Sequence, residues 1–230
     1  MKTPPCGDVA GEIPVLEFKN VSFSWPGGKG LSGVSFAVPA GQFVLISGPS
    51  GSGKSTLLRL AVRLEEPTQG EIFIHGEPFK SIYPPELRTR ISFVQQTPTV
   101  LPGTVRENLL MPFNLEIRKS SSLPGDDELY DWLGRLALDD VALDSEAAEL
   151  SVGQRQRLCL IRSLLPKPVV ICFDEPTSAL DIESREKVEQ IAEELAAEGV
   201  CILMVNHTNY HPACPHMLLT VSGGLVEVLP

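Results

Sequence analysis

The sequence has no long apolar run. Its longest uninterrupted hydrophobic stretches, residues 169–173 and 200–205, have the length of a strand, whereas a helix that crosses a bilayer needs about 20 apolar residues. The first 14 residues contain no hydrophobic segment of the kind found in secretory signals. We therefore expect a cytoplasmic protein that reaches the inner face of a membrane only through a partner.

The sequence also lacks a disulfide framework. Its five cysteines are an odd number and are scattered along the chain, unlike the regular spacing in small cross-linked domains. Cys172 and Cys201 stand inside apolar runs, where a reduced cysteine usually acts as a small core hydrophobe. We expect these thiols to be structural.

Positive charge is scarce. The chain carries 19 Lys and Arg against 29 Asp and Glu, a formal net charge of −10. This balance disfavours a protein whose main task is to neutralise nucleic-acid phosphates or anionic lipid, but it leaves room for a local basic pocket. With 230 residues, of which 43% are hydrophobic, the chain suits one globular domain or one domain with an inserted lobe.

Short β elements are expected in the first hundred residues. Residues 15–23 and 34–38 alternate between apolar and polar side chains, which is typical of strands with one buried face. Residues 43–46 are apolar throughout, as in a strand covered on both faces. A helix is expected over 56–64, because its apolar residues follow helical spacing. Further strands are expected at 72–74 and 91–94.

The pattern changes in the second half of the chain. Residues 97–166 predict short helices joined by polar loops, that is, a mostly helical lobe. After it, residues 169–173 and 201–205 predict buried strands separated by a charged helix at 183–198. A strand, a helix and a strand at this spacing indicate parallel crossovers and an α/β layer fold.

A phosphate-binding pattern, G-x-x-x-x-G-K-[ST], is matched in full by Gly48-Pro49-Ser50-Gly51-Ser52-Gly53-Lys54-Ser55, with Thr56 next. From average residue usage, a chance match in a chain of this length is roughly 1%. An expected strand precedes the pattern and an expected helix follows it, which is the context the motif needs. The alternative, a coincidental Gly/Ser-rich turn, is therefore disfavoured.

The residue types in this pattern fit the binding of a nucleoside triphosphate. Gly51 and Gly53 allow a tight loop whose N–H groups point at an anion. Lys54 supplies a cation to the β and γ phosphates, and the hydroxyl of Ser55 suits Mg²⁺. The helix that begins near Lys54 directs its positive end at the phosphates. ATP and Mg²⁺ are the expected ligands.

Two acids follow the apolar run that ends at Phe173. Carboxylates at the carboxyl end of a buried strand lie where ligands bind in open α/β sheets. Asp174 is placed to hold Mg²⁺, and Glu175 to orient the attacking water as general base. A solvated Asp-Glu pair in a turn is the alternative; taken alone the two weigh evenly, and the phosphate-binding loop favours catalysis.

A third motif identifies a family. Leu150-Ser151-Val152-Gly153-Gln154, followed by Arg155-Gln156-Arg157, resembles the LSGGQ signature of ABC ATPases. The other family motifs are present in order: Trp25 at the aromatic position, Gln96 in the Q-loop, Ser178-Ala179-Leu180-Asp181 in the D-loop, and His207 as the switch histidine. The resemblance covers roughly residues 15–226.

The resemblance implies the architecture. We expect an α/β P-loop NTPase with a RecA-like core, an N-terminal antiparallel β subdomain and an inserted helical subdomain. Residues 1–14 would form a flexible tail and residues 15–230 the ABC ATPase domain, with the helical subdomain at about 97–166.

The resemblance also assigns roles within the site. Trp25 would stack on adenine, Gln96 would join Ser55 and Asp174 around Mg²⁺, and Lys54, Gln96, Glu175 and His207 would carry catalysis. Ser151, Gly153, Gln154 and Asp181 would contact the nucleotide from a second copy. Because the helical lobe projects away from the phosphate-binding loop in this family, the implied assembly is a head-to-tail homodimer that seals two ATP molecules.

Two positions depart from the family pattern. Val152 replaces the usual glycine of the signature, and a branched side chain restricts the backbone there. We expect activity to survive this change, with weaker closure of the dimer. Thr208 stands where aspartate is common, which leaves the role of His207 intact.

The resemblance extends to a group of transporters. Three further segments look like those of the short bacterial ATPase subunits of iron exporters, whose partner is a separate membrane permease: Gln96-Thr97-Pro98-Thr99, Gly103-Thr104-Val105 and Leu160-Ile161-Arg162-Ser163-Leu164. The alternatives are an importer ATPase for another small solute, a soluble ABC ATPase that acts outside transport, and a degenerate cassette that only binds ATP. Retained Lys54, Glu175 and His207 oppose the last.

A cluster of metal-like residue types lies near the C-terminus. His207, His211, Cys214 and His216 have types found in zinc sites. His207 is already committed to the γ-phosphate by the resemblance, and Pro212 and Pro215 predict an irregular loop. Metal binding is therefore disfavoured here, because spacing alone is weak evidence.

Overall fold

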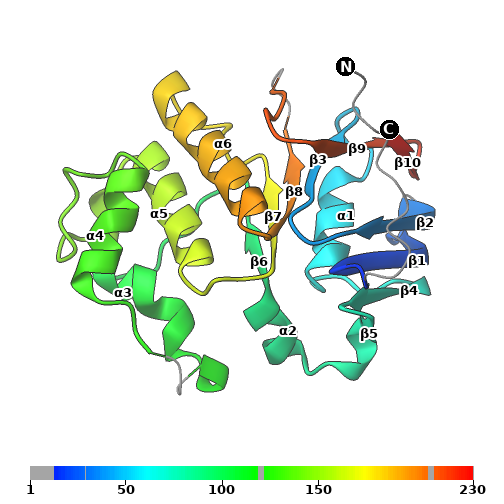
Figure 1. Cartoon of the computed structure of the whole chain (residues 1–230), viewed down its shortest axis with the longest axis horizontal. Helices are drawn as coiled ribbons and strands as arrows, with labels where there is room; N and C mark the ends of the chain where they lie inside the picture. Colours follow the sequence, from blue (N-terminus) through cyan, green and yellow to red (C-terminus); the bar gives the residue numbers. More distant parts are fainter. Residues whose placement is uncertain (1–12, 29, 119–121, 207–209, 230) are drawn as a thin grey trace.

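Two sheets and two groups of helices make up the structure (Figure 1). The computed structural model describes residues 13–28, 30–118, 122–206 and 210–229. An antiparallel sheet has the strand order β2-β1-β4-β5. Its strands are β1 (Leu16–Ser24), β2 (Gly30–Val38), β4 (Gln69–Ile74) and the short β5 (Glu77–Pro78).

The second sheet has the order β10-β9-β3-β8-β7-β6. All its neighbouring strands run parallel except the antiparallel pair β9 and β10. The strands are β3 (Phe43–Ser47), β6 (Ile91–Val94), β7 (Val170–Asp174), β8 (Cys201–Val205), β9 (His216–Ser222) and β10 (Leu225–Leu229). The carboxyl ends of β3, β7 and β8 therefore meet at one edge of the sheet, which is where ligands bind in such folds.

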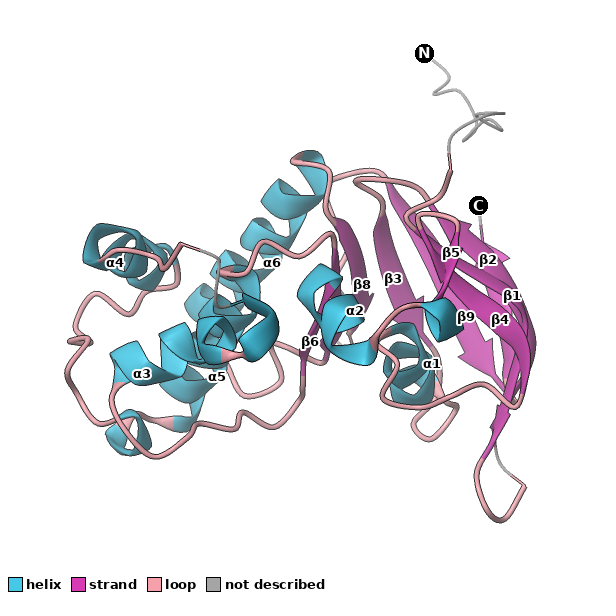
Figure 2. Cartoon of the chain, turned by 90° about the horizontal axis from the view of Figure 1, so that it is seen from below, coloured by secondary structure: helices cyan, strands magenta, loops and turns pink. Residues whose placement is uncertain are grey.

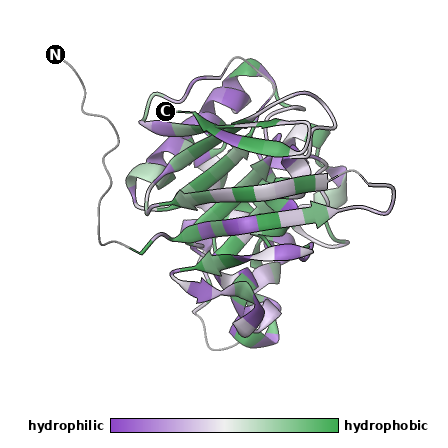
Figure 3. Ribbon diagram, turned by 90° about the vertical axis from the view of Figure 1, so that its right-hand side faces the viewer, coloured by the Kyte–Doolittle hydropathy of each residue, from purple (hydrophilic) through white to green (hydrophobic). Residues whose placement is uncertain are grey.

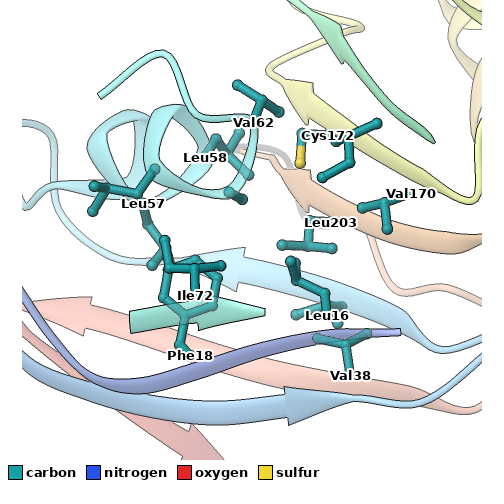
Figure 4. Close-up of a cluster of buried hydrophobic side chains, with 14 of the residues drawn as sticks. Leu16, Phe18, Val38, Leu57, Leu58, Val62, Ile72, Val170, Cys172 and Leu203 are labelled. Carbon is teal, nitrogen blue, oxygen red and sulfur yellow. The ribbon is translucent and has the colours of Figure 1, made fainter. Parts of the chain in front are cut away.

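The central strands are buried at every position, which explains their unbroken apolar sequence. Their side chains alternate between two cores: Val170 and Cys172 enter a core shared with helix α1 and the antiparallel sheet, whereas Ile171 and Phe173 face a core of helices. Figure 4 shows Cys172 close to Leu58 and Leu203 in the first core. Burial raises the pKa of Cys172 far above its usual value, so this thiol is inert and structural.

Helix α1 (Lys54–Ala61) packs between the two sheets. Its residues Leu57, Leu58 and Leu60 are fully buried, so the position of its first turn is fixed by the core. Viewed from the side of the antiparallel sheet, the strands show alternating apolar and polar residues (Figure 3). The sheet therefore buries one face and exposes the other.

A helical lobe lies against the mostly parallel sheet, on the side of β6, as Figure 2 shows. Residues 97–166 contain α3 (Val105–Leu110), α4 (Asp126–Arg135) and α5 (Val152–Leu164), together with short 3₁₀ turns. Helix α6 (Ile182–Ala197) connects β7 to β8. None of the helices in the described ranges is long and apolar enough to span a membrane.

The expected α/β fold with an N-terminal antiparallel sheet is confirmed, and some element bounds differ. The first helix begins at Lys54 and ends at Ala61 rather than Leu64, because the chain turns there toward β4. Helix α2 (Pro84–Arg90) and strands β9 and β10 were not expected. Strand β10 is mostly exposed, so it lacks the clear apolar alternation that predicts a strand.

Candidate active site

The loop between β3 and α1 contains glycines whose backbone conformation disfavours other residues. Gly48 and Gly53 have φ angles of 140° and 113°, which L-residues with side chains rarely adopt. A Cβ atom on Gly48 would also lie 2.1 Å from the carbonyl oxygen of Val221. Strand β9 thus packs directly behind the loop and holds its shape.

Lys54 is buried inside this loop, with 6% of its surface exposed. Its ammonium group donates to the carbonyl oxygens of Gly48 and Pro49, at 2.8 and 3.0 Å. A buried ammonium is costly unless it is hydrogen-bonded, so the loop's own carbonyls hold it in place. The buried hydroxyl of Ser52 has no hydrogen-bond partner among the described residues, which suits a cradle shaped for an anionic ligand.

Ser55 and Asp174 meet across the sheet. The hydroxyl of Ser55 donates to a carboxylate oxygen of Asp174 at 3.0 Å, although 119 residues separate them in the sequence. Burial raises the pKa of Asp174, and the hydrogen bond from Ser55 lowers it in part. A hydroxyl and a carboxylate side by side are the hard oxygen ligands that Mg²⁺ prefers, so these residues fit that ion.

Glu175 adopts an unusual backbone conformation. Its φ angle is 51°, in the left-handed region that is uncommon for residues with side chains and typical of functional sites. Its backbone N–H donates to the carbonyl oxygen of Val205 at 3.1 Å. The amide of Gln96 donates to its carboxylate at 2.7 Å, so the structure brings these two predicted residues together.

An open cavity of about 980 Å³ joins these groups. It is lined by residues 50–56, Trp25, Gln96 and Glu175. A second cavity of about 470 Å³ lies beside it, where Asp174 lines the wall with Ser55 and Gln96. The glycine-rich loop, the paired oxygens of Ser55 and Asp174 and the carboxylate of Glu175 therefore converge on one place, an arrangement that suits hydrolysis of a phosphoanhydride.

Trp25 stands at the rim of this cavity. Its indole N–H donates to the hydroxyl of Thr56 at 3.4 Å, and its ring meets Phe23 edge to face with 4.9 Å between centroids. The indole is 36% exposed. An aromatic ring held at the rim offers a face on which a base can stack.

Ser151 caps the N-terminus of α5. It is the N-cap residue: its hydroxyl accepts from the backbone N–H of Gln154 at 3.2 Å, and the Gln154 side chain accepts from the Ser151 N–H at 2.9 Å. Gly153 leaves space beside Leu180, whose methyl group would lie 3.5 Å from an added Cβ. Within the described residues, none of Ser151, Gly153 and Gln154 lines the large cavity.

Val152 is accommodated without backbone strain. It is the first residue of α5 and is not among the described residues with positive φ, so glycine is not needed at this position. Half of its surface is exposed. The expected effect of Val152 on dimer closure stays a prediction.

Asp181 caps the next helix. Its carboxylate accepts from the backbone N–H and the hydroxyl of Ser184, each at 2.9 Å, and these bonds lower the pKa of Asp181. Arg157 of α5 donates to the same Ser184 hydroxyl at 2.5 Å. Ser184 thereby links Asp181 to helix α5.

His207 lies outside the described residues, so its predicted role stays a prediction, as does that of its neighbour Thr208. In the part of the chain that is described, no group of three or more His, Cys, Asp or Glu side chains could hold a metal ion. His216 is the first residue of β9 rather than part of an irregular loop, because β9 pairs with β3 in the buried sheet.

Some of the residues that line the large cavity were not predicted from the sequence. The cavity wall includes Ser32, Thr68 and the turn Gly223–Gly224 between β9 and β10. The backbone N–H of Ser32 donates to the carbonyl of Gly224 at 2.8 Å, which joins the two sheets beside the cavity. The paired glycines were a turn signal in the sequence, but their position next to the phosphate loop follows only from the fold.

Comparison with known proteins relates the chain to one protein family. The sequence pattern of the ABC transporter family matches residues 31–178. A probable iron export ATP-binding protein, FetA, from Escherichia coli (strain K12) is 38% identical over 195 residues, which cover 84% of this chain and 85% of that protein. ABC transporter I family member 17 from Arabidopsis thaliana is 39% identical over 225 residues, which cover 96% and 84% of the two chains.

A solved structure shows the same fold. The ATP-binding cassette MJ0796, in a dimeric post-hydrolysis state bound to ADP and Pi, superposes with a TM-score of 0.81 at 29% identity. The match covers 92% of this chain and 96% of that one. The likeness therefore extends over the sheets and the helical lobe together.

Proposed function

Because this chain belongs to the ABC transporter family and is an ATPase that binds ATP, we propose that it works as one half of a head-to-tail homodimer. In this assembly, the Ser151 end of α5 in one copy closes over the triphosphate held by Lys54 of the other. The dimer energises transport through a separate membrane permease.

One observation carries the proposal. The cavity that contains the phosphate loop, Gln96 and Glu175 is open, and the described residues that line it do not include the signature at Ser151. The N-terminus of α5 is nevertheless capped, exposed and suited to an anion. A second copy, turned head to tail, would supply this missing wall.

The residues divide the chemistry among them. Lys54 and the loop of residues 48–56 would bind the phosphates, and Trp25 would stack on adenine. Glu175, oriented by Gln96, would take the proton of the attacking water, and His207 would contact the γ-phosphate. Ser55, Asp174 and Gln96 would hold Mg²⁺, which when bound neutralises charge on the phosphate oxygens.

The transport cycle follows from a ligand-biased equilibrium between two states. ATP contacts both copies and favours the closed dimer, while hydrolysis removes the γ-phosphate and with it the contacts that hold the dimer shut. The solved cassette MJ0796 is described as dimeric with ADP and Pi, which supports this arrangement. The permease would hold the protein at the inner face of the membrane.

Iron is the cargo that the comparisons favour. FetA is named a probable iron export ATP-binding protein, and the similarity covers 84% of this chain and 85% of FetA. Cargo selection belongs to the permease, so the assignment is tested there. Proteoliposomes with the permease encoded beside this protein should move iron in an ATP-dependent manner; equal transport without ATP, or of another solute alone, would contradict it.

The dimer is tested with Glu175→Gln. This variant should bind ATP and hydrolyse it at least about 100-fold more slowly, so the ATP-bound dimer accumulates. Size-exclusion chromatography with light scattering should show a dimer with ATP and a monomer without it. Lys54→Ala in the same background is the control, because it removes the phosphate contact and should abolish the dimer. A strictly monomeric ATP complex of Glu175→Gln would refute the proposal.

A further inference from the structure

The segment that carries Gln96 has little support from its own backbone. It follows β6 as an irregular stretch. Within the part of the chain that is described, residues 96–102 make no backbone–backbone hydrogen bond in a turn or loop. Gln96 nevertheless reaches across to Glu175 at 2.7 Å. Something other than secondary structure must hold this segment in position.

Side chains of α5 make these contacts. Gln156 donates to the carbonyl oxygen of Gln95 at 3.3 Å. Arg162 donates to the carbonyl oxygen of Thr99 at 2.7 Å, and the thiol of Cys159 donates to the same oxygen at 3.4 Å. The three side chains are spaced three residues apart, so they follow one side of the helix. Gln96 therefore lies between two anchored carbonyl groups.

Asn108 extends the anchorage. It is 1% exposed, and its carbonyl oxygen accepts from the backbone N–H of Leu101 at 2.8 Å while its amide donates to the Leu101 carbonyl at 3.0 Å. Arg162 donates to the same Asn108 oxygen at 3.4 Å. One guanidinium thus connects Thr99 with the residue that fixes Leu101.

A contribution to stability does not explain why Gln156 is buried. It is 2% exposed, and its side-chain carbonyl oxygen has no hydrogen-bond partner among the described residues. A buried, half-satisfied amide costs free energy that an apolar residue would avoid. Its one bond goes to Gln95, the direct neighbour of Gln96.

We propose that Gln156 and Arg162 are positioning residues for ATP hydrolysis: they fix the backbone on both sides of Gln96 so that its amide meets Glu175. Helix α5 then links the two ATP sites of the dimer, because Ser151 at its tip faces the nucleotide of one copy and its side chains hold the segment that serves the other. This inference depends on the proposed role of Gln96.

The test compares Gln156→Leu and Arg162→Lys with the unmodified protein. Leucine keeps the size of the side chain and removes the bond, and lysine keeps the charge but loses the fork that reaches two acceptors. Because small displacements of positioned groups cost much rate, each variant should lower kcat about 10-fold. KM for MgATP should stay within about 2-fold, since the phosphate loop is untouched.

Arg106→Ala is the matched control. Arg106 lies in the same lobe, and in the hydrogen bonds of the described residues its side chain meets only the carboxylates of Asp126 and Asp144. Its loss should lower the Tm of the lobe without changing kcat. If Arg162→Lys fails to fold, Gln156→Leu still provides the measurement.

Double variants with Gln96→Ala separate the possible outcomes. If Gln156 and Arg162 act through Gln96, adding either change to Gln96→Ala produces no further loss of kcat. The inference would be overturned if the losses of kcat multiplied in the double variants, or if both single variants kept the kcat of the unmodified protein. Neither result would contradict the role of Gln96. An unchanged kcat in Gln96→Ala alone would refute that role and the inference with it.

Discussion

Asp174 ends a strand whose five residues are all buried, and its carboxyl group shares a hydrogen bond with Ser55. Burial raises its pKa, which means that the folded protein holds its proton more tightly than the unfolded chain does. The ionised form needed to bind a cation is thus the form that the nucleotide-free fold disfavours. Stability and function compete at this residue.

Replacing Asp174 by asparagine should therefore stabilise the nucleotide-free protein and abolish hydrolysis. Asparagine still accepts the bond from Ser55 and carries no charge to desolvate. We expect a gain of about 1 kcal/mol at pH 7, or roughly 2–4 °C in Tm. Calorimetry and a phosphate-release assay measure the two effects.

The stability difference between Asp174→Asn and the unmodified protein should depend on pH. A carboxyl group with a raised folded pKa lowers stability as the pH rises from its unfolded value, about 3.9, through its folded value. The advantage of Asp174→Asn should be greatest at high pH and shrink as the pH falls toward 4. A lower Tm of Asp174→Asn at pH 7 would contradict the argument.

At the scale of elements, α5 performs two tasks with one sequence. Its N-terminus is closed by a capping box between Ser151 and Gln154, and one side of the helix holds the segment around Gln96. An N-cap hydroxyl contributes to helix stability, and the same exposed N-terminus attracts phosphate. The structural and the proposed functional roles of Ser151 can be separated by substitution.

Ser151→Ala should lower both stability and turnover, whereas Ser151→Asp should lower turnover alone. Alanine loses the cap, which costs about 1 kcal/mol, or roughly 2–4 °C in Tm. Aspartate caps a helix as well as serine does, but its charge would repel the triphosphate of the partner copy. Thermal unfolding and ATPase rates distinguish the two; an Asp variant with normal turnover would show that Ser151 does not face ATP.

At the scale of the whole molecule, one arginine ties the helical lobe to the rest. Arg118, in the 3₁₀ turn Glu116–Arg118, donates to the carbonyl oxygen of Thr89 in α2 at 2.7 Å and to that of Pro166 after α5 at 3.3 Å. Burial lowers the pKa of its guanidinium. Its hydrogen bonds are therefore partly shielded from water. In such surroundings a hydrogen bond of a charged group contributes more to stability than it does at an exposed position.

Arg118→Ala should loosen the connection between lobe and core. The expected loss is about 1–2 kcal/mol, or roughly 3–6 °C in Tm, together with faster limited proteolysis near residues 115–118. Arg135→Ala is the comparison, because Arg135 joins α4 to Glu194 of α6 through a surface pair whose side chains are 35% and 42% exposed, and surface pairs contribute little. Equal losses in the two variants would mean that Arg118 is an ordinary surface residue.

The sequence by itself determined the family and the ATPase activity. The phosphate-binding pattern, the acids after a buried strand and the LSGGQ-like segment are local, because each depends on backbone shape or ligand type within a few residues. The fold class followed from strand and helix periodicity, since each element must bury its apolar face. Helix α2 and strands β9 and β10 were missed because short or exposed elements leave little periodic signal.

The tertiary structure alone decided which distant residues meet. Ser55 with Asp174 and Gln96 with Glu175 are separated by 119 and 79 positions, and only the strand order β3-β8-β7-β6 places them together. The contacts of Gln156 and Arg162 with the backbone around Gln96 were likewise invisible in the sequence. Sequence patterns record what each segment buries or binds, whereas contacts between segments depend on how the whole chain packs.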